Sequence, residues 1–327
     1  MTHTLPLPLL LARKASSLAS RTSVAAQRQL GRFAGRRLMD PARGNDWIAS
    51  RIAGGKPLMV TRIGSAELGA WNAWKGVQAQ QRSRWSRYAS IVRGEPGHWP
   101  GAVVATIANN AGFFPATAEA LARYAAGLEQ WIACADATAI FTFTREEERL
   151  LAGTHAALML PMALEPYVHD SPWTLALEGR KVLVVHPFAA SIAAQYPKRG
   201  QLFAGKRLLP AFELRTVAAV QSIGGHVPQF PDWFAALDNM KQQIAATDFD
   251  IAIIGAGAYG MALAAHVKGL GKQAIHLGGS TQVLFGIKGK RWDSRPEVAC
   301  FYNEHWVRPS AQETPPDAAN IEGGCYW

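Results

Sequence analysis

The chain has little cysteine, and the cysteines it has are isolated. Its 327 residues contain Cys134, Cys300 and Cys325, an odd number of widely spaced thiols that forms neither a disulfide framework nor a metal-binding cluster. Such cysteine usage favours a reducing compartment. We therefore expect a cytoplasmic protein.

Several short catalytic motifs and long apolar runs are also missing. There is no His-Glu-x-x-His, no paired Cys-x-x-Cys, no P-loop and no Gly-x-Ser-x-Gly. The apolar stretch at residues 5–12 is too short to cross a bilayer, and its positive charges follow it, unlike those of a secretory signal. These absences exclude most simple hydrolase and kinase classes and argue against export.

Acidic residues are absent from the first 39 positions, which carry seven of the chain's cations: Arg13, Lys14, Arg21, Arg28, Arg32, Arg36 and Arg37. The net charge is +10, so the rest of the chain carries only about +3. A basic arm beside a short apolar tip can lie on the inner face of an anionic membrane, where each Lys or Arg adds ~1 kcal/mol. The alternative is a disordered leader. Both interpretations of the arm, residues 1–44, stay open.

The remaining composition is that of a globular domain, with 49% hydrophobic and 18% charged residues. From residue 45 to 300, apolar runs alternate with helical patterns, which predicts a doubly wound, mainly parallel α/β sheet with helices on both faces. The predicted strands are 58–63, 103–108, 138–142, 181–186, 250–254 and 273–277. The predicted helices are 46–53, 67–74, 116–134, 145–152, 233–246 and 259–270. We expect the aromatic tail, residues 301–327, to dock on this domain.

A glycine-rich turn is the strongest motif. Gly255, Gly257 and Gly260 fit Gly-x-Gly-x-x-Gly between a predicted strand and helix, where free backbone N–H groups can bind a phosphate. A dinucleotide site also needs an acid about 20 residues on. Residues 273–279 contain none. We therefore expect no NAD, leaving another nucleotide or a tight turn without a ligand.

Two further strand ends carry polar residues. Glu67 follows strand 58–63 through Gly64 and Ser65, at the carboxyl edge where open α/β sheets bind ligands. Alternatively, Ser65 caps the next helix and Glu67 complements its dipole. His186 ends strand 181–186 and is a candidate base or ligand contact, or a structural hydrogen bonder.

Near the end of the predicted domain, a second glycine-rich turn and a basic loop follow strand 273–277. His276 precedes the turn at Gly278, Gly279 and Ser280. The loop contains Lys288, Lys290, Arg291 and Trp292, which suit a diphosphate and a stacked base or sugar. The alternative for the loop is a solvated basic segment.

Residues 75–93 form a longer basic stretch, which interleaves cations with aromatic residues and has no acid. It could bind single-stranded nucleic acid or an anionic lipid-linked acceptor. Alternatively, it is an exposed helix face whose aromatic residues are buried.

Residues 45–290 resemble the GT-D-fold glycosyltransferases of bacterial surface glycosylation. Arg62, Gly64 and Glu67 match the family's Arg-x-Gly-Asp-x-Glu element, while Ser65 stands at its first carboxylate. His276 stands where the family's late segment has an acid. The chain is also similar to a bacterial subgroup that shares its His-Pro-Phe at 186–188, its turn at 257–260, its basic loop at 285–292 and its ending at 322–327.

The resemblance implies a glycosyltransferase that moves a sugar from a nucleotide-diphosphate donor to a cell-envelope polysaccharide or glycoconjugate acceptor, glycan or lipid-linked. Glu67 would be the base or a metal ligand, and His186 the second catalytic candidate. The implied donor site comprises Arg62, Gly64, Ser65, Gly255, Gly257, Tyr259, Gly260, His276, Gly278, Gly279, Ser280, Lys288, Lys290 and Arg291.

The resemblance also bears on cofactors. Family members are associated with Mn²⁺ or Mg²⁺, which Ser65 calls into question because it supplies no carboxylate. The other function classes are a catalytically silent nucleotide-binding scaffold and an NAD-dependent oxidoreductase, the latter resting on the glycine fingerprint alone. No specific nucleic-acid partner is expected.

Overall fold

The computed structural model describes residues 6–223, 229–321 and 323–327. Within them, a 9-stranded sheet has the order β1-β2-β5-β4-β3-β9-β8-β6-β7, and every neighbouring pair except β1 and β2 is parallel. The strands are β1 (Arg32–Phe33), β2 (Arg36–Met39), β3 (Leu58–Arg62), β4 (Ala137–Ala139), β5 (Ala157–Met159), β6 (Lys181–His186), β7 (Glu213–Ala218), β8 (Ile251–Ile254) and β9 (Gln273–His276).

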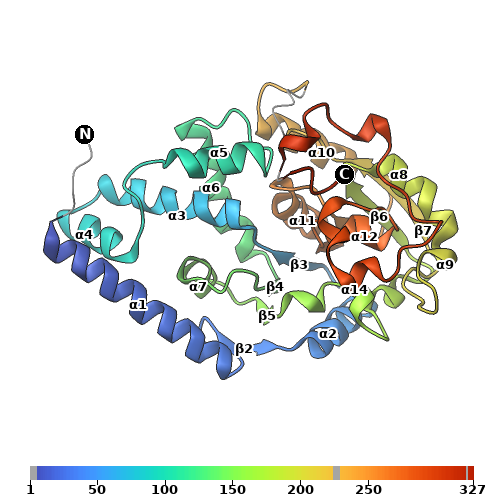
Figure 1. Ribbon diagram of the computed structural model, residues 1–327, viewed down its shortest axis with the longest axis horizontal. Helices are drawn as coiled ribbons and strands as arrows, with labels where there is room; N and C mark the ends of the chain where they lie inside the picture. Colours follow the sequence, from blue (N-terminus) through green and yellow to red (C-terminus); the bar gives the residue numbers. More distant parts are fainter. Residues whose placement is uncertain (1–5, 224–228, 322) are drawn as a thin grey trace.

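Helices cover both faces of this sheet (Figure 1). The α-helices are α1 (Leu7–Gln29), α2 (Pro41–Ala53), α3 (Ser65–Gln80), α4 (Arg84–Arg93), α5 (Gly101–Asn109), α6 (Ala118–Ala133), α7 (Arg145–Ala152), α8 (Ala189–Gln195), α9 (Arg199–Leu202), α10 (Trp233–Ala245), α11 (Tyr259–Gly269), α12 (Ser280–Leu284), α13 (Lys290–Asp293) and α14 (Pro296–Ala299). Short 3₁₀ turns are η1 (Pro161–Ala163), η2 (Pro166–Val168), η3 (Trp173–Leu177), η4 (Tyr196–Lys198), η5 (Ala311–Glu313) and η6 (Ala318–Asn320).

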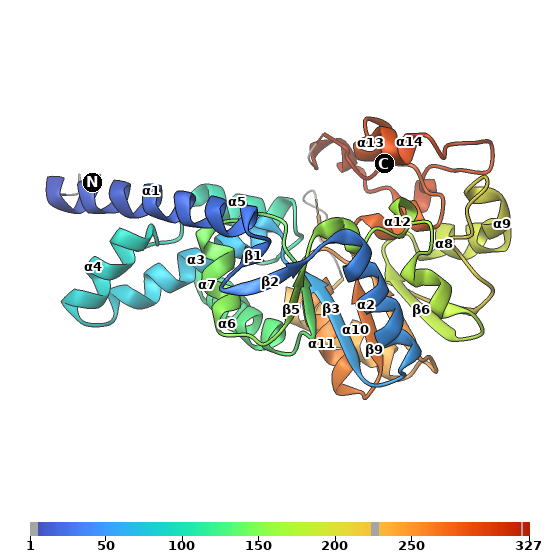
Figure 2. The ribbon, with the colours of Figure 1, turned by 90° about the horizontal axis from the view of Figure 1, so that it is seen from below.

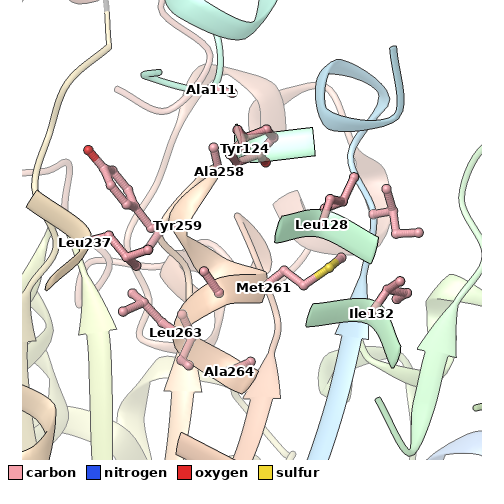
Figure 3. Close-up of a cluster of buried hydrophobic side chains, with 14 of the residues drawn as sticks. Ala111, Tyr124, Leu128, Ile132, Leu237, Ala258, Tyr259, Met261, Leu263 and Ala264 are labelled. Carbon is pink, nitrogen blue, oxygen red and sulfur yellow. The ribbon is translucent and has the colours of Figure 1, made fainter. Parts of the chain in front are cut away.

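The core has two layers because side chains alternate along each buried strand. In β6, Leu183 and Val185 point into one cluster with α6, α10 and α11, whereas Val182 and Val184 point into the other with α2 and η3. Figure 3 shows part of this first layer, where Leu237 of α10 lies beside Leu263 of α11 and Leu128 of α6 lies on the other side of α11, near Met261. The predicted doubly wound, Rossmann-like α/β architecture is therefore confirmed.

Most predicted elements exist, and one predicted strand was wrong. Residues 103–108 lie in helix α5, not in a strand. Val103, Val104 and Ile107 are spaced so that one helical face packs on the core, and a short apolar run cannot distinguish that face from a buried strand. Strand β4 is shorter than predicted and ends at Ala139.

Four strands were not predicted, because they are very short or polar: β1, β2, β5 and β7. Strand β7 lies at the sheet edge and exposes Glu213 and Arg215, so its sequence lacks the apolar run of a central strand. Strand β2 comes from the basic arm and pairs in parallel with β5. The arm is therefore partly built into the sheet, and the disordered-leader alternative is wrong for residues 7–29, which form α1.

The C-terminal tail docks on the domain by hydrogen bonds as well as aromatic contacts. The buried carboxylate of Glu313 accepts from the backbone N–H groups of Ala190 and Ser191 at 2.9 and 3.1 Å. The indole N–H of Trp327 donates to the Glu313 carbonyl at 3.1 Å, and the Lys290 N–H donates to the Trp327 carbonyl at 3.1 Å. These bonds hold the last residues against α8 and α13.

Candidate functional site

A pocket of about 270 Å³ lies at the carboxyl ends of β3, β9, β8, β6 and β7. It is at the topological switch point, because the chain winds outward from β3 to β4 and β5, then begins again at β6 on the other side. Its lining residues are Arg62, Gly64, Ser65, Ala66, Glu67, Asn110, Ala111, His186, Pro187, Phe188, Val220, Gln221, Ser222, Ile223, Gly255, Ala256, Gly257, Tyr259, His276, Gly278, Gly279, Arg291, Trp292, Tyr326 and Trp327. The strand-end residues predicted from sequence thus converge.

The turn from β3 to α3 positions Glu67. Helix α3 begins at Ser65, and its N-cap is Gly64, which makes no side-chain cap, so Ser65 is not the capping residue. The Glu67 side chain folds back over Gly64, where its carboxylate occupies the space of an absent Cβ. Burial raises the pKa of Glu67 above its usual 4.5, against the opposing effects of its own backbone N–H and the Arg62 charge. Glu67 is therefore a carboxylate with increased proton affinity in the pocket.

Arg62 stands across the same turn, and within the described part of the chain no acid forms an ion pair with it. Its guanidinium lies 3.8 Å from the centre of the Phe141 ring and packs against Gly278. Burial lowers its pKa and the Glu67 charge opposes this, but an arginine stays protonated in proteins. Among the residues that the structure describes, this guanidinium forms no ion pair and donates no hydrogen bond. A half-buried, unpaired guanidinium suits an anionic ligand.

His186 enters the pocket as a neutral hydrogen-bond donor. The Phe188 backbone N–H donates to His186 Nδ1 at 2.9 Å, so in the neutral ring the proton lies on Nε2. Burial lowers the pKa of His186 to about 3. At neutral pH the side chain can therefore donate to a ligand oxygen, which favours the predicted ligand contact over the base, and a catalytic role stays a prediction.

His276 is neutral as well and is held between β3 and α11. Its Nδ1 lies 3.0 Å from Thr61 Oγ1, and its ring edge packs on Gly260, where a Cβ would collide with it. Burial, and then the Arg62 charge, lower the pKa of His276 to about 3. Gly260 and Ser280 were both predicted to belong to the donor site, but neither lines the pocket. Gly260 lies beneath the His276 ring, and Ser280 is buried.

The glycines of the β8–α11 turn allow close packing and leave two donors. A Cβ on Gly255 would lie 2.7 Å from the His186 ring, and Gly257 adopts a positive φ of 51°. The N–H groups of 258–260 are already bonded to loop carbonyls. Across the described part of the chain, those of Ala256 and Gly257 make no hydrogen bond, so two backbone donors remain for an anion.

Tyr259, also predicted at the donor site, lines the pocket but is held by the core. Its ring stacks on Trp233 at 4.7 Å, and its hydroxyl lies 3.1 Å from Ser222 Oγ. Figure 3 shows the side chain beside Leu237. These contacts fix the first turn of α11.

The structure brings one of the three predicted loop cations to the pocket. Arg291 lines it and donates to the Tyr326 hydroxyl at 3.2 Å. Lys288 lies over the Tyr302 ring at 5.0 Å, and Lys290 donates to the Gly323 carbonyl at 3.0 Å. Helix α13 begins at Lys290, so successive side chains point in different directions, which sequence proximity does not reveal.

Sequence reasoning did not identify several lining residues. Tyr326 and Trp327 come from the docked tail, and Asn110 and Gln221 from loops after α5 and β7. The aromatic ending of the chain was the one usable signal. Loop residues such as Asn110 have no local pattern, because only tertiary packing brings them to the sheet edge.

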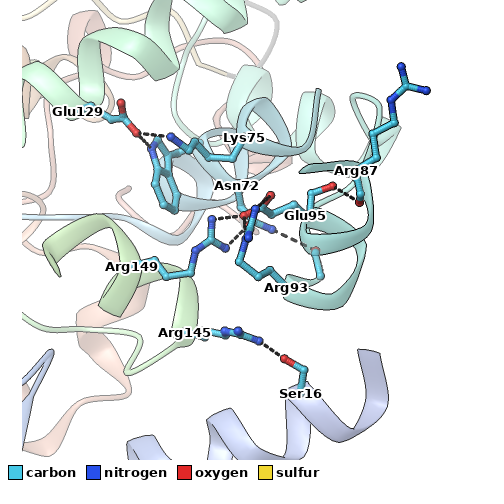
Figure 4. Close-up of polar contacts among 12 residues, drawn as sticks. Ser16, Asn72, Lys75, Arg87, Arg93, Glu95, Glu129, Arg145 and Arg149 are labelled. Carbon is cyan, nitrogen blue, oxygen red and sulfur yellow. Dashed lines mark hydrogen bonds and ion pairs between the residues drawn. The ribbon is translucent and has the colours of Figure 1, made fainter. Parts of the chain in front are cut away.

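The basic stretch 75–93 is partly neutralised within the fold (Figure 4). Glu129 accepts from the Trp71 indole at 2.9 Å and from Lys75 at 3.1 Å. Buried Glu95 pairs with Arg93 at 2.7 Å and also with Arg149. Trp71 and Trp74 are buried. The buried Trp71 and Trp74 fit the interpretation as an exposed helix face with buried aromatics at the start of the stretch, whereas Trp85 within it is 79% exposed, so the other interpretations stay open there.

The pocket residues do not fit a divalent metal held by protein ligands alone. Among its described lining residues Glu67 has the one side-chain carboxylate, and no described group of three His, Cys, Asp or Glu could hold a metal. The Nδ1 atoms of His186 and His276 already have partners. We therefore assign no step to Mn²⁺ or Mg²⁺, and dependence on either ion stays a prediction.

Fold and pocket together define an α/β protein with a pocket at the switch point of its sheet, lined by cations, histidines and backbone N–H groups. No protein-family model and no curated protein matches the chain. A solved structure described as a selenomethionine-substituted domain of unknown function 1792 is similar over 82% of this chain and 96% of its own, with 11% identity and a TM-score of 0.34. A likeness of that size identifies neither a ligand nor an activity. No helix among the described residues is long and apolar enough to cross a membrane.

Proposed function

We propose that the chain is a glycosyltransferase whose switch-point pocket binds a nucleotide-diphosphate-sugar. The observation that carries the proposal is the half-buried Arg62, which lies over Phe141 and has no protein counter-ion among the described residues. Arg291, the His186 Nε2–H and the N–H groups of Ala256 and Gly257 lie around the same pocket. Arg62, the His186 Nε2–H and the two backbone N–H groups can donate to one anion, to which Arg291 adds positive charge.

Glu67 is the general base of the proposed reaction. The acceptor hydroxyl gives its proton to the Glu67 carboxylate as its oxygen forms a bond to the anomeric carbon of the donor. The bond from that carbon to the diphosphate oxygen breaks, and its electron pair leaves with the diphosphate. Arg62 and Arg291 stabilise the resulting negative charge. The raised pKa of Glu67 makes it a better proton acceptor than an exposed carboxylate.

The acceptor in this proposal is a cell-envelope glycan or lipid-linked glycoconjugate, assembled on the cytoplasmic side of the membrane. A catalytically silent, nucleotide-binding scaffold is the second candidate function. One observation favours it: Ser65 lies where the resembling family has an acid, leaving one carboxylate among the described residues of the pocket. Donor turnover separates the two functions, since a scaffold would bind the nucleotide without releasing it from the sugar.

A thermal-shift screen tests binding first. Purified protein is heated with UDP, GDP, CDP and dTDP and their common sugars, each with EDTA, Mg²⁺ or Mn²⁺. One nucleotide should raise Tm selectively, since a ligand of the native state stabilises it. Arg62→Gln should lower the affinity for that nucleotide by at least roughly 30-fold, because it removes a half-buried charged donor. Arg43→Gln, an exposed arginine of α2, is the matched control and should bind normally.

The outcomes are distinct. Equal binding by the Arg62 variant would remove that residue from the site, and a folded protein that no nucleotide stabilises would contradict the proposed donor. A stabilising nucleotide-sugar that is never turned over with any envelope acceptor would favour the scaffold.

A further inference from the structure

Helix α1 presents a row of leucines to solvent. Leu7, Leu11 and Leu18 are 66, 56 and 68% exposed. Their spacing of four and seven residues places them on one helical face. Val24 lies on the opposite side and is buried against the core. The exposed row is therefore not an unfilled part of the fold but a separate apolar surface.

Cations flank this row, and no acid opposes them on the same helix. Lys14 and Arg21 share the solvent side of α1 with the leucines by the same spacing. Helix α4 packs beside α1 at the same end of the molecule (Figures 1 and 2). Trp85 of α4 is 79% exposed, and Arg84 and Arg87 lie on the same short helix. We call α1 with α4 the basic platform.

A groove of about 950 Å³ runs between the basic platform and the loop before α7. The described cations that line it are Arg13, Arg21, Arg28, Arg93 and Arg145, against one acid, Glu146. Arg93 is paired with Glu95, and Arg145 donates to the Ser16 hydroxyl, as Figure 4 shows. Arg13 and Arg21 form no ion pair within the described residues. The groove therefore keeps positive charge available to an external anion.

We propose that the basic platform docks on an anionic lipid bilayer. The leucine row and Trp85 enter the interface, and Lys14 and Arg21, which share the solvent side of α1 with the leucines, contact headgroup phosphates. A nucleic acid would offer phosphates but no apolar phase for three leucines. A second copy would bring together two acid-free α1 helices of the same charge sign. A bilayer satisfies both the apolar row and the charge, and α1 lies on it rather than across it.

Vesicle flotation of the full chain tests this proposal. The protein should float with vesicles of phosphatidylcholine and phosphatidylglycerol, but not with phosphatidylcholine alone, and salt should weaken binding. Lys14→Gln/Arg21→Gln should lower affinity roughly 30-fold, from two lost cations. Leu11→Ser/Leu18→Ser should lower it at least tenfold, because less apolar surface is buried.

Matched controls make the same chemical changes elsewhere. Arg43→Gln/Lys56→Gln removes two exposed cations near α2, and Met162→Ser removes an exposed apolar side chain; both should bind vesicles normally. The proposal would be overturned if binding did not depend on phosphatidylglycerol. It would also be overturned if the leucine and cation variants bound vesicles like the wild type. A concentration-dependent dimer in light scattering that the leucine changes abolish would overturn it too. Nucleotide binding should be unchanged in all these variants, so the test does not depend on the proposed transferase.

Discussion

The carboxylate of Glu67 occupies the space beside Gly64 that any other residue at that position would need for its Cβ. The backbone of Gly64 is extended, with φ −81°, so its conformation does not require glycine. The requirement comes from the close approach of Glu67. The turn after β3 therefore has room for the carboxylate in the pocket because Gly64 has no side chain.

Gly64→Ala should move the Glu67 carboxylate while the fold survives, because the colliding group is the end of a flexible side chain. We expect Tm within a few degrees of the wild type and a transferase activity at least roughly tenfold lower, since a displaced catalytic group loses alignment. Gly69→Ala, also in α3 with ordinary contacts near 3.9 Å, is the control. It should stabilise the helix by about 0.5–1 kcal/mol and keep activity. Full activity of folded Gly64→Ala would show that the carboxylate position is unimportant.

Glu67→Gln should lower kcat about 100-fold or more while donor affinity changes little, because the amide cannot accept the acceptor's proton. In the wild type, activity should fall as pH drops through the raised pKa of Glu67, so the acid limb should lie above pH 4.5. Glu119→Gln, in the exposed first turn of α6, should leave both the rate and the limb unchanged. The pH–rate profiles of the wild type and the variants test this prediction. If the acid limb is still present in Glu67→Gln, it reports the protonation of another group.

The buried, neutral histidines should make the protein lose stability as pH falls. The folded-state pKa values of His186 and His276 are lowered to about 3 from 6.5, so the unfolded chain binds more protons between these limits. Stability present above pH 6.5 is therefore lost on acidification, by about 2 kcal/mol per histidine between pH 7 and 5. Urea unfolding at both pH values measures the loss.

An asparagine variant assigns that loss, because Asn does not titrate and its amide can either accept a hydrogen bond from the Thr61 hydroxyl or donate one to it. His276→Asn should reduce the pH-dependent loss by about 2 kcal/mol, and exposed His98→Asn should retain it. An undiminished loss in the His276 variant would show that His276 does not contribute.

Gly260→Ala should destabilise the fold, because its Cβ would strike the His276 ring from a buried helix backbone. We expect a loss of about 1–3 kcal/mol, typical of overpacking. Gly269→Ala, at the last residue of the same helix, meets nothing within 4 Å and should cost nothing. Chemical denaturation of both variants provides the comparison, and equal stability would contradict the packing argument.

Local sequence pattern predicted the central sheet well. Strand β6 was predicted with its exact bounds, since a fully buried strand is a continuous apolar run. The run at 103–108 failed because helix α5 uses the same apolar residues on one face. Edge strand β7 was missed because solvent accepts its charged side chains.

The sequence by itself determined the strand ends that carry Arg62, Glu67 and His186, because parallel strands bring their carboxyl ends to one edge. Tertiary structure alone decided what those residues can do. Burial and the absence of a counter-ion among described residues left Arg62 available to an anion, and the Phe188 N–H made His186 a donor. Packing also brought Tyr326 to the pocket and turned Lys288 away from it. Charge state and direction depend on neighbours distant in the chain, which no local pattern encodes.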